Sequence, residues 1–489
     1  MDKSSSGTTG TTAPQSAQSW IRRHELLARW GAVILSGCAV ALVPVPDGIT
    51  RGGWNLLAIF VATIVGSIVQ PIPAAAIVLM AITLVALVGA LPVTEALAGW
   101  ADPVVWIVLP AFFIARAMLK TGLGRRIAFW FIRVLGASSL GLGYSLVCTD
   151  FLLGSVIPAN SARCGGVIFP ISRSLAVAYE SEPGPSARRL GAFLMILIYQ
   201  CDVVVASMWL TGQASNPLAQ RFAAQTAGVE VSYAGWILGA LAPGLVSLAL
   251  VPLVLYKLFP PEIKRTPAAA EFARTELERM GPMSRAEKIL LMVFFLVAGL
   301  WMTTALHGIH YAVVALLGVS VLLLTSVLEW ADLLAERTAW DIFIWYGGLV
   351  RMGNALGESG ITKRFAEAAA GFTADWSWGA AMAGLLLVYF FAHYGFASIT
   401  AHITAMYIPF LVVLLAAGAP AYLAAMSLAY FSNLAASLTH YGTTPAPIIF
   451  GAGYVSQGTW WKLGLTVSVM NIVIWTVVGF GWWKLLGQW

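Results

Sequence analysis

Long apolar runs separated by short polar stretches fill most of the chain beyond residue 26. A helix that crosses a bilayer needs about 20 mostly apolar residues. The pattern therefore predicts an all-α polytopic membrane protein with about eleven transmembrane helices. The predicted crossings lie near residues 26–46, 53–70, 72–92, 103–121, 190–226, 233–259, 287–306, 310–329, 340–357, 419–450 and 463–486.

Two further apolar stretches, residues 137–180 and 376–418, are interrupted halfway by small polar residues. Each stretch is close to twice the length of about 20 residues that one crossing needs. This pattern predicts two re-entrant hairpins, each entering and leaving the membrane on one side. Non-helical backbone at membrane depth is tolerated where protein or a water-filled cavity surrounds it.

Three motifs recur in the same order in the two halves of the chain, at nearly constant separation. The pairs are 122–126 with 360–364, 159–163 with 398–402, and 211–217 with 441–447. Such a repeat indicates a duplicated plan of helix, hairpin and helix broken by Gly and Pro. Because the first hairpin is predicted to enter from the cytoplasm and the second from outside, the repeat is expected to be inverted.

The repeat divides the chain into four predicted parts. A disordered cytoplasmic tail covers 1–25, the first half 26–259, a cytoplasmic linker 260–288 and the second half 289–489. The broken helices are 190–226 and 419–450. A cytoplasmic N-terminus places most Lys and Arg residues inside, as expected for a multi-pass protein of a cell inner membrane.

Composition agrees with a membrane protein and excludes several classes of function. Charged residues make up 10% of the chain and hydrophobic residues 59%, whereas soluble domains carry roughly 25% charged residues. The net charge of +6 is attributed to cytoplasmic loops, and nucleic-acid binding is not expected. Cys38, Cys148, Cys164 and Cys201 have no metal-ligand spacing. We therefore expect neither a metal nor another cofactor.

Broken helices that meet near the membrane midplane are typical of secondary transporters, which bind substrate between the two halves. The N-terminal ends of half-helices carry partial positive charge and suit an anion. The candidate site therefore comprises the two hairpin tips and the Gly- and Pro-containing breaks. We expect a small anionic substrate there.

The motifs at these positions resemble the divalent anion:sodium symporter family, the INDY-type carboxylate transporters. The likeness is greatest to its antiporter branch of citrate/succinate, tartrate/succinate and plastid 2-oxoglutarate/malate translocators, and is carried by residues 157–166, 212–217, 396–402 and 439–445. The resemblance implies exchange of di- or tricarboxylates across the bilayer by an elevator-type or rocking homodimer. The specific carboxylate remains open.

The family holds one substrate carboxylate at each tip with a Ser-Asn-Thr triplet. The corresponding triplets here are Ala159-Asn160-Ser161 and Ser398-Ile399-Thr400, so neither is complete. By this resemblance, the expected substrate-binding residues are Asn160, Ser161, Gly212, Gln213, Ser398, Thr400, Thr443 and Thr444.

Arg163 and His402 follow the two tips at equivalent positions of the repeat. A charge near mid-membrane costs about 2.5–3.5 kcal/mol on insertion scales, which calls for a function. We hypothesise that these residues are charge-compensating cations that stand where the symporters bind sodium. Asp150 and Asp202 are expected to pair with Arg163 or to relay protons.

Three alternatives remain open at this stage. One is a sodium-coupled dicarboxylate symporter, and another is an ion channel. The third is a polytopic membrane enzyme that uses His402 or His440 with Asp150 or Asp202 as acid and base. His440 is equally compatible with substrate contact and with packing.

Overall fold

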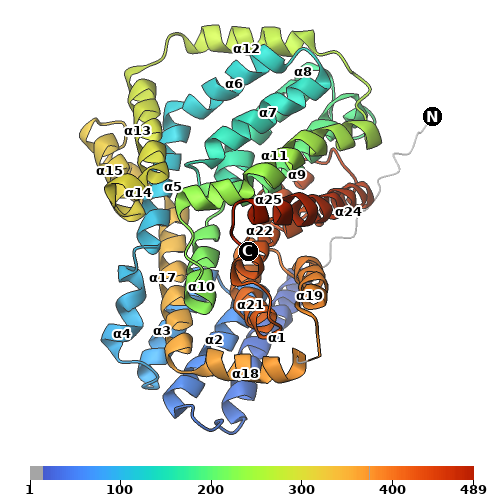
Figure 1. The fold of residues 1–489 in the computed structure, drawn as a ribbon. Helices are drawn as coiled ribbons and strands as arrows, with labels where there is room; N and C mark the ends of the chain where they lie inside the picture. The colour runs from blue at the N-terminus through green and yellow to red at the C-terminus, as the bar shows by residue number, and fades with distance from the viewer. Residues whose placement is uncertain (1–14, 374) are drawn as a thin grey trace, which may run out of the picture.

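The computed structural model describes residues 15–373 and 375–489, and this part of the chain is helical without a β-strand (Figure 1). Seven of its helices are long and apolar enough to cross a membrane. The count is eight when the bent pair Val93–Ala101 and Val105–Thr121 is taken as one span. The polytopic all-α class is thereby confirmed. Of the other predicted crossings, 72–92 and 310–329 correspond to the shorter apolar helices Ala74–Leu87 and Tyr311–Leu324. The total of eleven stays a prediction.

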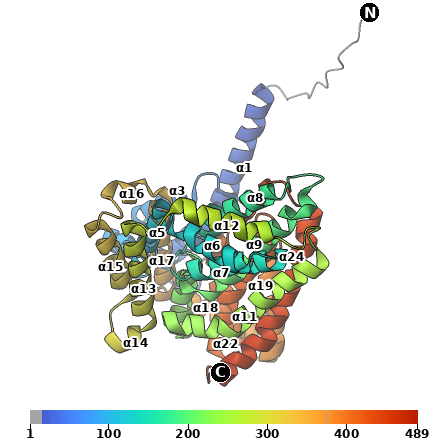
Figure 2. The same cartoon turned by 90° about the horizontal axis from the view of Figure 1, so that it is seen from above.

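The first half contains eleven α-helices in the described residues. They are α1 (Gln15–Leu42), α2 (Arg51–Val69), α3 (Ala74–Leu87), α4 (Val93–Leu97), α5 (Val105–Thr121), α6 (Leu123–Leu135), α7 (Ser139–Gly154), α8 (Phe169–Ala178), α9 (Gly191–Met208), α10 (Asn216–Ala227) and α11 (Tyr233–Leu258). Residues 1–14 of the predicted tail lie outside the described residues. Residues 15–25 are helical rather than disordered, and Figure 2 shows α1 extending beyond the other helices.

The linker and the second half hold the remaining α-helices of the described chain. They are α12 (Pro267–Met280), α13 (Arg285–Met302), α14 (Thr304–His307), α15 (Tyr311–Leu324), α16 (Trp330–Ala335), α17 (Arg337–Glu358), α18 (Ile361–Thr373), α19 (Trp378–Ala392), α20 (Ile399–His402), α21 (Ile408–Ala416), α22 (Ala421–Leu434), α23 (Pro445–Gly451), α24 (Gln457–Ile474) and α25 (Phe480–Leu485).

One feature of the predicted repeat can be compared directly between the halves. A left-handed glycine separates α5 from α6, and another separates α17 from α18. Gly122 has a φ of +77° and Gly360 a φ of +79°, a conformation that is costly for residues with a Cβ atom. The shared Gly therefore marks the same sharp turn in both halves.

Both ends of the first hairpin contact the linker. At its start, the Ser139 amide donates to the Lys264 carbonyl at 3.0 Å and the Thr266 amide to the Ala137 carbonyl at 2.9 Å. At its end, the Tyr179 hydroxyl accepts from the Ala269 amide at 2.9 Å. Both ends of residues 137–180 therefore lie beside one short segment, an arrangement compatible with the predicted hairpin.

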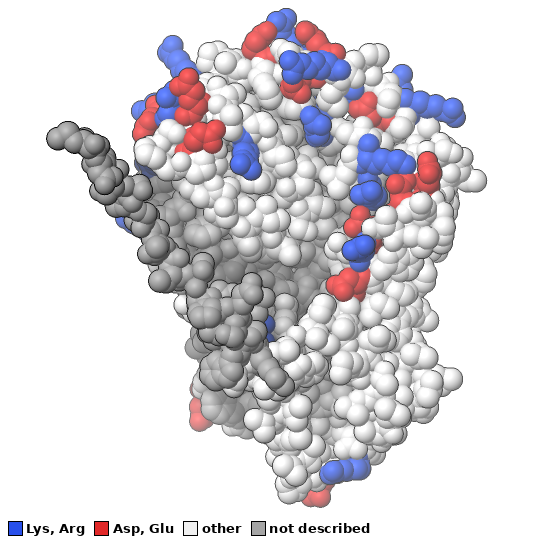
Figure 3. Space-filling view, turned by 180° about the vertical axis from the view of Figure 1, so that it is seen from behind, with Lys and Arg blue, Asp and Glu red and all other residues white. Residues whose placement is uncertain are grey.

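The linker also bonds to helices of both halves. Arg126 on α6 pairs with Glu287 on α13 at 2.6 Å and donates to the Gly281 carbonyl at 2.9 Å. Ser284 and Glu287 form a capping box at the start of α13. Figure 3 shows charged side chains gathered at the end of the molecule where α12 lies, above a largely uncharged face.

Helix α9 forms the centre of the core, and all of its residues are buried. Its polar side chains join the two halves. Tyr199 donates from its hydroxyl to the Ala436 carbonyl at 2.5 Å, and Gln200 donates to the Ser437 carbonyl at 2.9 Å. Nearby, the Asn433 amide donates to Asn216 Oδ1 at 2.8 Å. These bonds satisfy the carbonyls that a helix break leaves free.

Candidate substrate site

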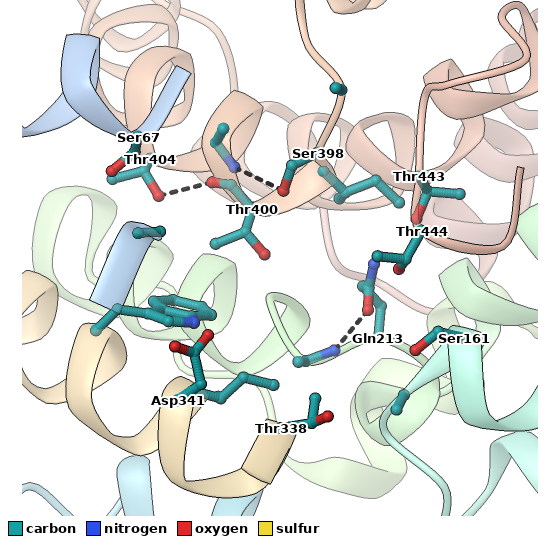
Figure 4. Close-up of a pocket in the computed structure, with 18 of the residues that line it drawn as sticks. Ser67, Ser161, Gln213, Thr338, Asp341, Ser398, Thr400, Thr404, Thr443 and Thr444 are labelled. Carbon is teal, nitrogen blue, oxygen red and sulfur yellow. Dashed lines mark hydrogen bonds between the residues drawn. The ribbon is translucent and has the colours of Figure 1, made fainter. Parts of the chain in front are cut away.

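A cavity of about 260 Å³ lies where the two hairpin tips meet the two helix breaks (Figure 4). Its opposite wall comes from the end of α2, the start of α3 and the first turns of α17. Seven of the eight expected substrate-binding residues line it: Asn160, Ser161, Gln213, Ser398, Thr400, Thr443 and Thr444. Segments far apart in the chain therefore contribute polar side chains to one space.

Asn160, at the tip of the first hairpin, bonds to the helix break of the second half. Its amide donates to the Thr443 hydroxyl at 3.0 Å, and its carbonyl oxygen accepts from the Thr444 hydroxyl at 3.3 Å. The side chain is 1% exposed, so these bonds determine its orientation. The first tip and the second break thus form one polar unit at the cavity.

The second tip is ordered by its own hydrogen bonds. Ser398 caps α20, since its hydroxyl accepts from the Ala401 amide at 3.4 Å. Thr404 donates to the Thr400 carbonyl at 2.7 Å. In Figure 4 the Thr400 hydroxyl points into the cavity. This tip presents hydroxyl groups where the family has a Ser-Asn-Thr triplet.

Four helical segments begin at the cavity. The segment Ser161–Ile168 is π-helical, and α10, α20 and α23 begin at Asn216, Ile399 and Pro445. Three of these starts directly follow or include a residue that lines the cavity, and Ala214, two residues before α10, lines it as well. Free backbone N–H groups and the positive ends of helix dipoles favour an anion. The arrangement is therefore suited to a carboxylate.

The glycine of each helix break packs directly against backbone. A Cβ atom on Gly212 would lie 2.8 Å from the Ala206 carbonyl oxygen, and one on Gly442 would lie 2.8 Å from the Ala436 carbonyl oxygen. The two breaks thus repeat the same close approach. Gly212 itself does not line the cavity, in contrast to its prediction as a substrate-binding residue.

We predict that Gly212→Ala or Gly442→Ala destabilises the protein. Overpacking of this kind costs typically 1–3 kcal/mol, and the backbone contacted here has little room to move. The apparent unfolding temperature of the detergent-purified protein measures the effect. Gly299→Ala in α13 is the matched control, since a Cβ atom there meets no atom within 4 Å. Equal unfolding temperatures for the Gly212 and Gly299 variants would contradict the prediction.

Arg163 is fully buried behind the first tip and does not line the cavity. Its Nε pairs with Asp150 at 2.6 Å, and one terminal nitrogen pairs with Asp202 at 2.7 Å. Asp150 and Asp202 therefore pair with Arg163, as one of the two interpretations expected. Because two carboxylates neutralise Arg163, the predicted role as a free positive charge for the substrate does not fit its surroundings.

The remaining bonds of Arg163 connect the hairpin with the first helix break. Its Nη1 donates to the Ile157 carbonyl at 3.1 Å and to the Gly212 carbonyl at 2.9 Å. These are backbone oxygens of the tip region and of the broken helix. The guanidinium thus occupies the position between them.

His402 is also buried away from the cavity, which differs from its predicted role beside the substrate. Its ring packs 4.3 Å from the Tyr389 ring and 4.9 Å from that of His393. His393, which the sequence analysis did not single out, bonds through Nε2 to the Gly442 carbonyl at 2.9 Å. Gly442 corresponds to Gly212 in the repeat. His393, rather than His402, thus bonds to the Gly442 carbonyl in the second half, as Arg163 bonds to the Gly212 carbonyl in the first half.

His440 is a packing residue in this structure. Its Nδ1 accepts from Trp461 Nε1 at 3.0 Å, and its ring lies 4.5 Å from that of Phe450. In the described part of the chain, no group of three or more His, Cys, Asp or Glu residues is arranged to hold a metal ion.

The wall opposite the tips holds polar residues that were not predicted to belong to the site. They are Ser67, Gln70, Thr338 and Asp341, joined by Trp345. Polar groups at helix ends are common at membrane interfaces, which explains why most of these residues could not be recognised as site residues from the sequence. Asp341 did give a signal in the sequence, because an acidic residue in a predicted crossing is energetically costly and therefore indicates a function.

Three comparisons with known proteins extend over nearly the whole chain. Residues 24–489 match the family described as "Sodium:sulfate symporter transmembrane region". The chain is 45% identical to a putative malate transporter, YflS, of Bacillus subtilis over 93% of this chain and 95% of the relative. It is 44% identical to chloroplastic dicarboxylate transporter 1 of Arabidopsis thaliana, over 94% of this chain and 83% of the relative.

Other similar proteins include inner membrane protein YbhI of Escherichia coli, 34% identical over 92% of this chain and 96% of the relative. Among solved structures, the YdaH transporter of Alcanivorax borkumensis covers 96% of this chain and 98% of its own at a TM-score of 0.53. At 14% identity this likeness concerns the fold alone. The chain therefore belongs to the family of the sodium:sulfate symporter transmembrane region, and it is a multi-pass membrane transporter rather than an enzyme.

Proposed function

We propose that this protein exchanges di- or tricarboxylates across a bacterial inner membrane without sodium. The named relatives support a carboxylate substrate, since they include a putative malate transporter and chloroplastic dicarboxylate transporters. The cavity supports a small anion, because hydroxyl groups and the starts of three helical segments line it. The homodimer and the cytoplasmic N-terminus remain part of this proposal.

The observation that carries sodium independence is the position of Arg163. Sodium needs several oxygen ligands, and the symporters of the resembling family take some of them from the hairpin tips and the broken helices. Here the carbonyls of Ile157 and Gly212 already accept hydrogen bonds from Arg163. In the second half, His393 bonds to the Gly442 carbonyl. A fixed side chain thus replaces an imported ion in each half.

The expectation of exchange rests on the electrostatic field of the groups that surround the cavity. Because Asp150 and Asp202 pair with Arg163, the positive field at the tips and breaks comes from helix N-termini and hydroxyl donors. A bound anion compensates this field in a low-dielectric environment. The loaded form therefore changes sides more readily than the empty form, which is the property of an exchanger.

Counterflow in proteoliposomes tests the proposal. Vesicles loaded with unlabelled succinate or malate are expected to take up labelled carboxylate equally well in sodium and in potassium buffers. Vesicles without internal carboxylate are expected to take up almost none. Uptake into such empty vesicles driven by an inward sodium gradient would contradict the proposal and would indicate sodium-coupled symport.

A further inference from the structure

Asp341 is the one charged side chain among the described residues that line the cavity. It lies in the first turns of α17, and Figure 4 shows its carboxylate pointing into the space between α17 and the second tip. Thr338 and Trp345 line the same wall from the same helix. The side chain is exposed to the cavity rather than buried in protein.

Several other acidic groups in the described part of the chain have basic partners. Asp150 and Asp202 pair with Arg163, and Asp332 pairs with Lys120 at 2.5 Å. Within the described part of the chain, the Asp341 carboxylate forms neither an ion pair nor a hydrogen bond, and no Lys, Arg or His lines the cavity. Its acceptor oxygens are therefore available to a molecule in the cavity.

The two walls of the cavity thus differ in chemistry. The wall of tips and breaks supplies donors, through the hydroxyls of Ser161, Thr400 and Thr443 and through helix N-termini. The α17 wall supplies an acceptor, because an ionised carboxylate can only accept hydrogen bonds. The cavity volume of about 260 Å³ is at the small end for ligand sites. One substrate molecule therefore faces both walls.

An ionised dicarboxylate without other polar groups has no donor to offer Asp341, and its charge is repelled by that carboxylate. A hydroxyl group on the carbon chain can donate to Asp341 while the substrate carboxylates bond to the donor wall. A hydrogen bond of this kind is charge-assisted and about twice as strong as a neutral one. The wall therefore distinguishes substrates of equal charge by their hydroxyl group.

We propose that Asp341 is a specificity-determining residue that accepts a hydrogen bond from a substrate hydroxyl, so that hydroxy-substituted dicarboxylates are favoured over unsubstituted ones. This inference rests on the proposed carboxylate exchange. It narrows the substrate class to 2-hydroxy dicarboxylates and their close analogues.

Competition in the counterflow assay tests this inference, with L-malate and succinate as probes because they differ by one hydroxyl. In the wild type, malate is expected to inhibit uptake of labelled substrate at a concentration about tenfold lower than succinate, the effect of one charge-assisted hydrogen bond. In Asp341→Asn, the ratio is expected to fall to about twofold, since the malate hydroxyl contact weakens while the relief of charge repulsion is the same for both dianions.

Glu336→Gln is the matched control. It removes one negative charge at the N-terminal end of α17, and Glu336 does not line the cavity. It is expected to keep the wild-type ratio. Asp341→Ser provides a second test of the same ratio if the Asn variant is not monodisperse after purification. An unchanged ratio in the Asp341 variants, or a wild-type ratio near one, overturns the inference while carboxylate exchange itself persists. Failure of the wild type to exchange any carboxylate overturns the proposed function as well.

Discussion

Replacing Arg163 by Met is expected to remove most of the folded protein. The substitution leaves Asp150 and Asp202 buried without their cation, at sites that are 2% and 0% exposed. Removing one partner of a buried ion pair typically costs about 3–5 kcal/mol, and two carboxylates lose a partner here. A typical protein is stable by about 5–15 kcal/mol in total. Size-exclusion chromatography and the unfolding temperature in detergent measure the loss.

A matched set of variants distinguishes the effect of charge from the effect of packing at Arg163, Asp150 and Asp202. Arg163→Met combined with Asp150→Asn and Asp202→Asn has no buried charge, so it is expected to regain much of the lost stability. Arg163→Lys keeps the charge but cannot form the same fork of hydrogen bonds, and an intermediate loss is expected. Wild-type stability of the single Met variant would show that the cluster does not support the fold.

The second large effect is expected from Asn160→Ala. The variant loses the bonds to Thr443 and Thr444 that join the first tip to the second break. It also loses an amide donor at the cavity, and hydrogen bonds to charged groups are worth about 1.5–3 kcal/mol. The carboxylate concentration for half-maximal counterflow should therefore rise about tenfold or more.

Two further variants show whether the effect of Asn160→Ala is specific to the cavity. Thr400→Ala changes a second cavity residue, and Asn354→Ala is the control outside the cavity. Thr400→Ala removes a cavity hydroxyl while the Thr400 carbonyl that accepts from Thr404 remains, so affinity should fall with little change in stability. Asn354→Ala removes an asparagine that lies on α17 outside the cavity and bonds to Gln225. It should leave the half-maximal concentration unchanged. Wild-type transport by both cavity variants would refute the assignment of the tips.

Much of the site could be predicted because its signals are local. The hairpins could be predicted because each apolar stretch is about as long as two crossings and has polar residues at its midpoint. The helix breaks could be predicted because Gly and Pro interrupt apolar runs. Seven expected binding residues line one cavity because both halves bring the same motif to the same place. Gly212 does not line the cavity, and a motif alone does not reveal which way a backbone carbonyl points.

Other features depend on tertiary distances that a sequence does not contain. Whether Arg163 faced substrate or carboxylates depended on how α7 and α9 pack around it. His393 was missed because its function arises from its distance to Gly442, and Asp341 because α17 forms a wall opposite segments distant in the chain. The inverted relation of the halves, the orientation and the dimer stay predictions.

The polar side chains of α9 have a consequence for the order in which the chain is made. Tyr199 and Gln200 bond to carbonyls that are synthesised 237 residues later, and Asn216 meets its partner Asn433 after 217 residues. Polar groups at membrane depth are costly while they lack partners. The first half therefore enters the bilayer as an incomplete intermediate, and folding of the core follows insertion of α22.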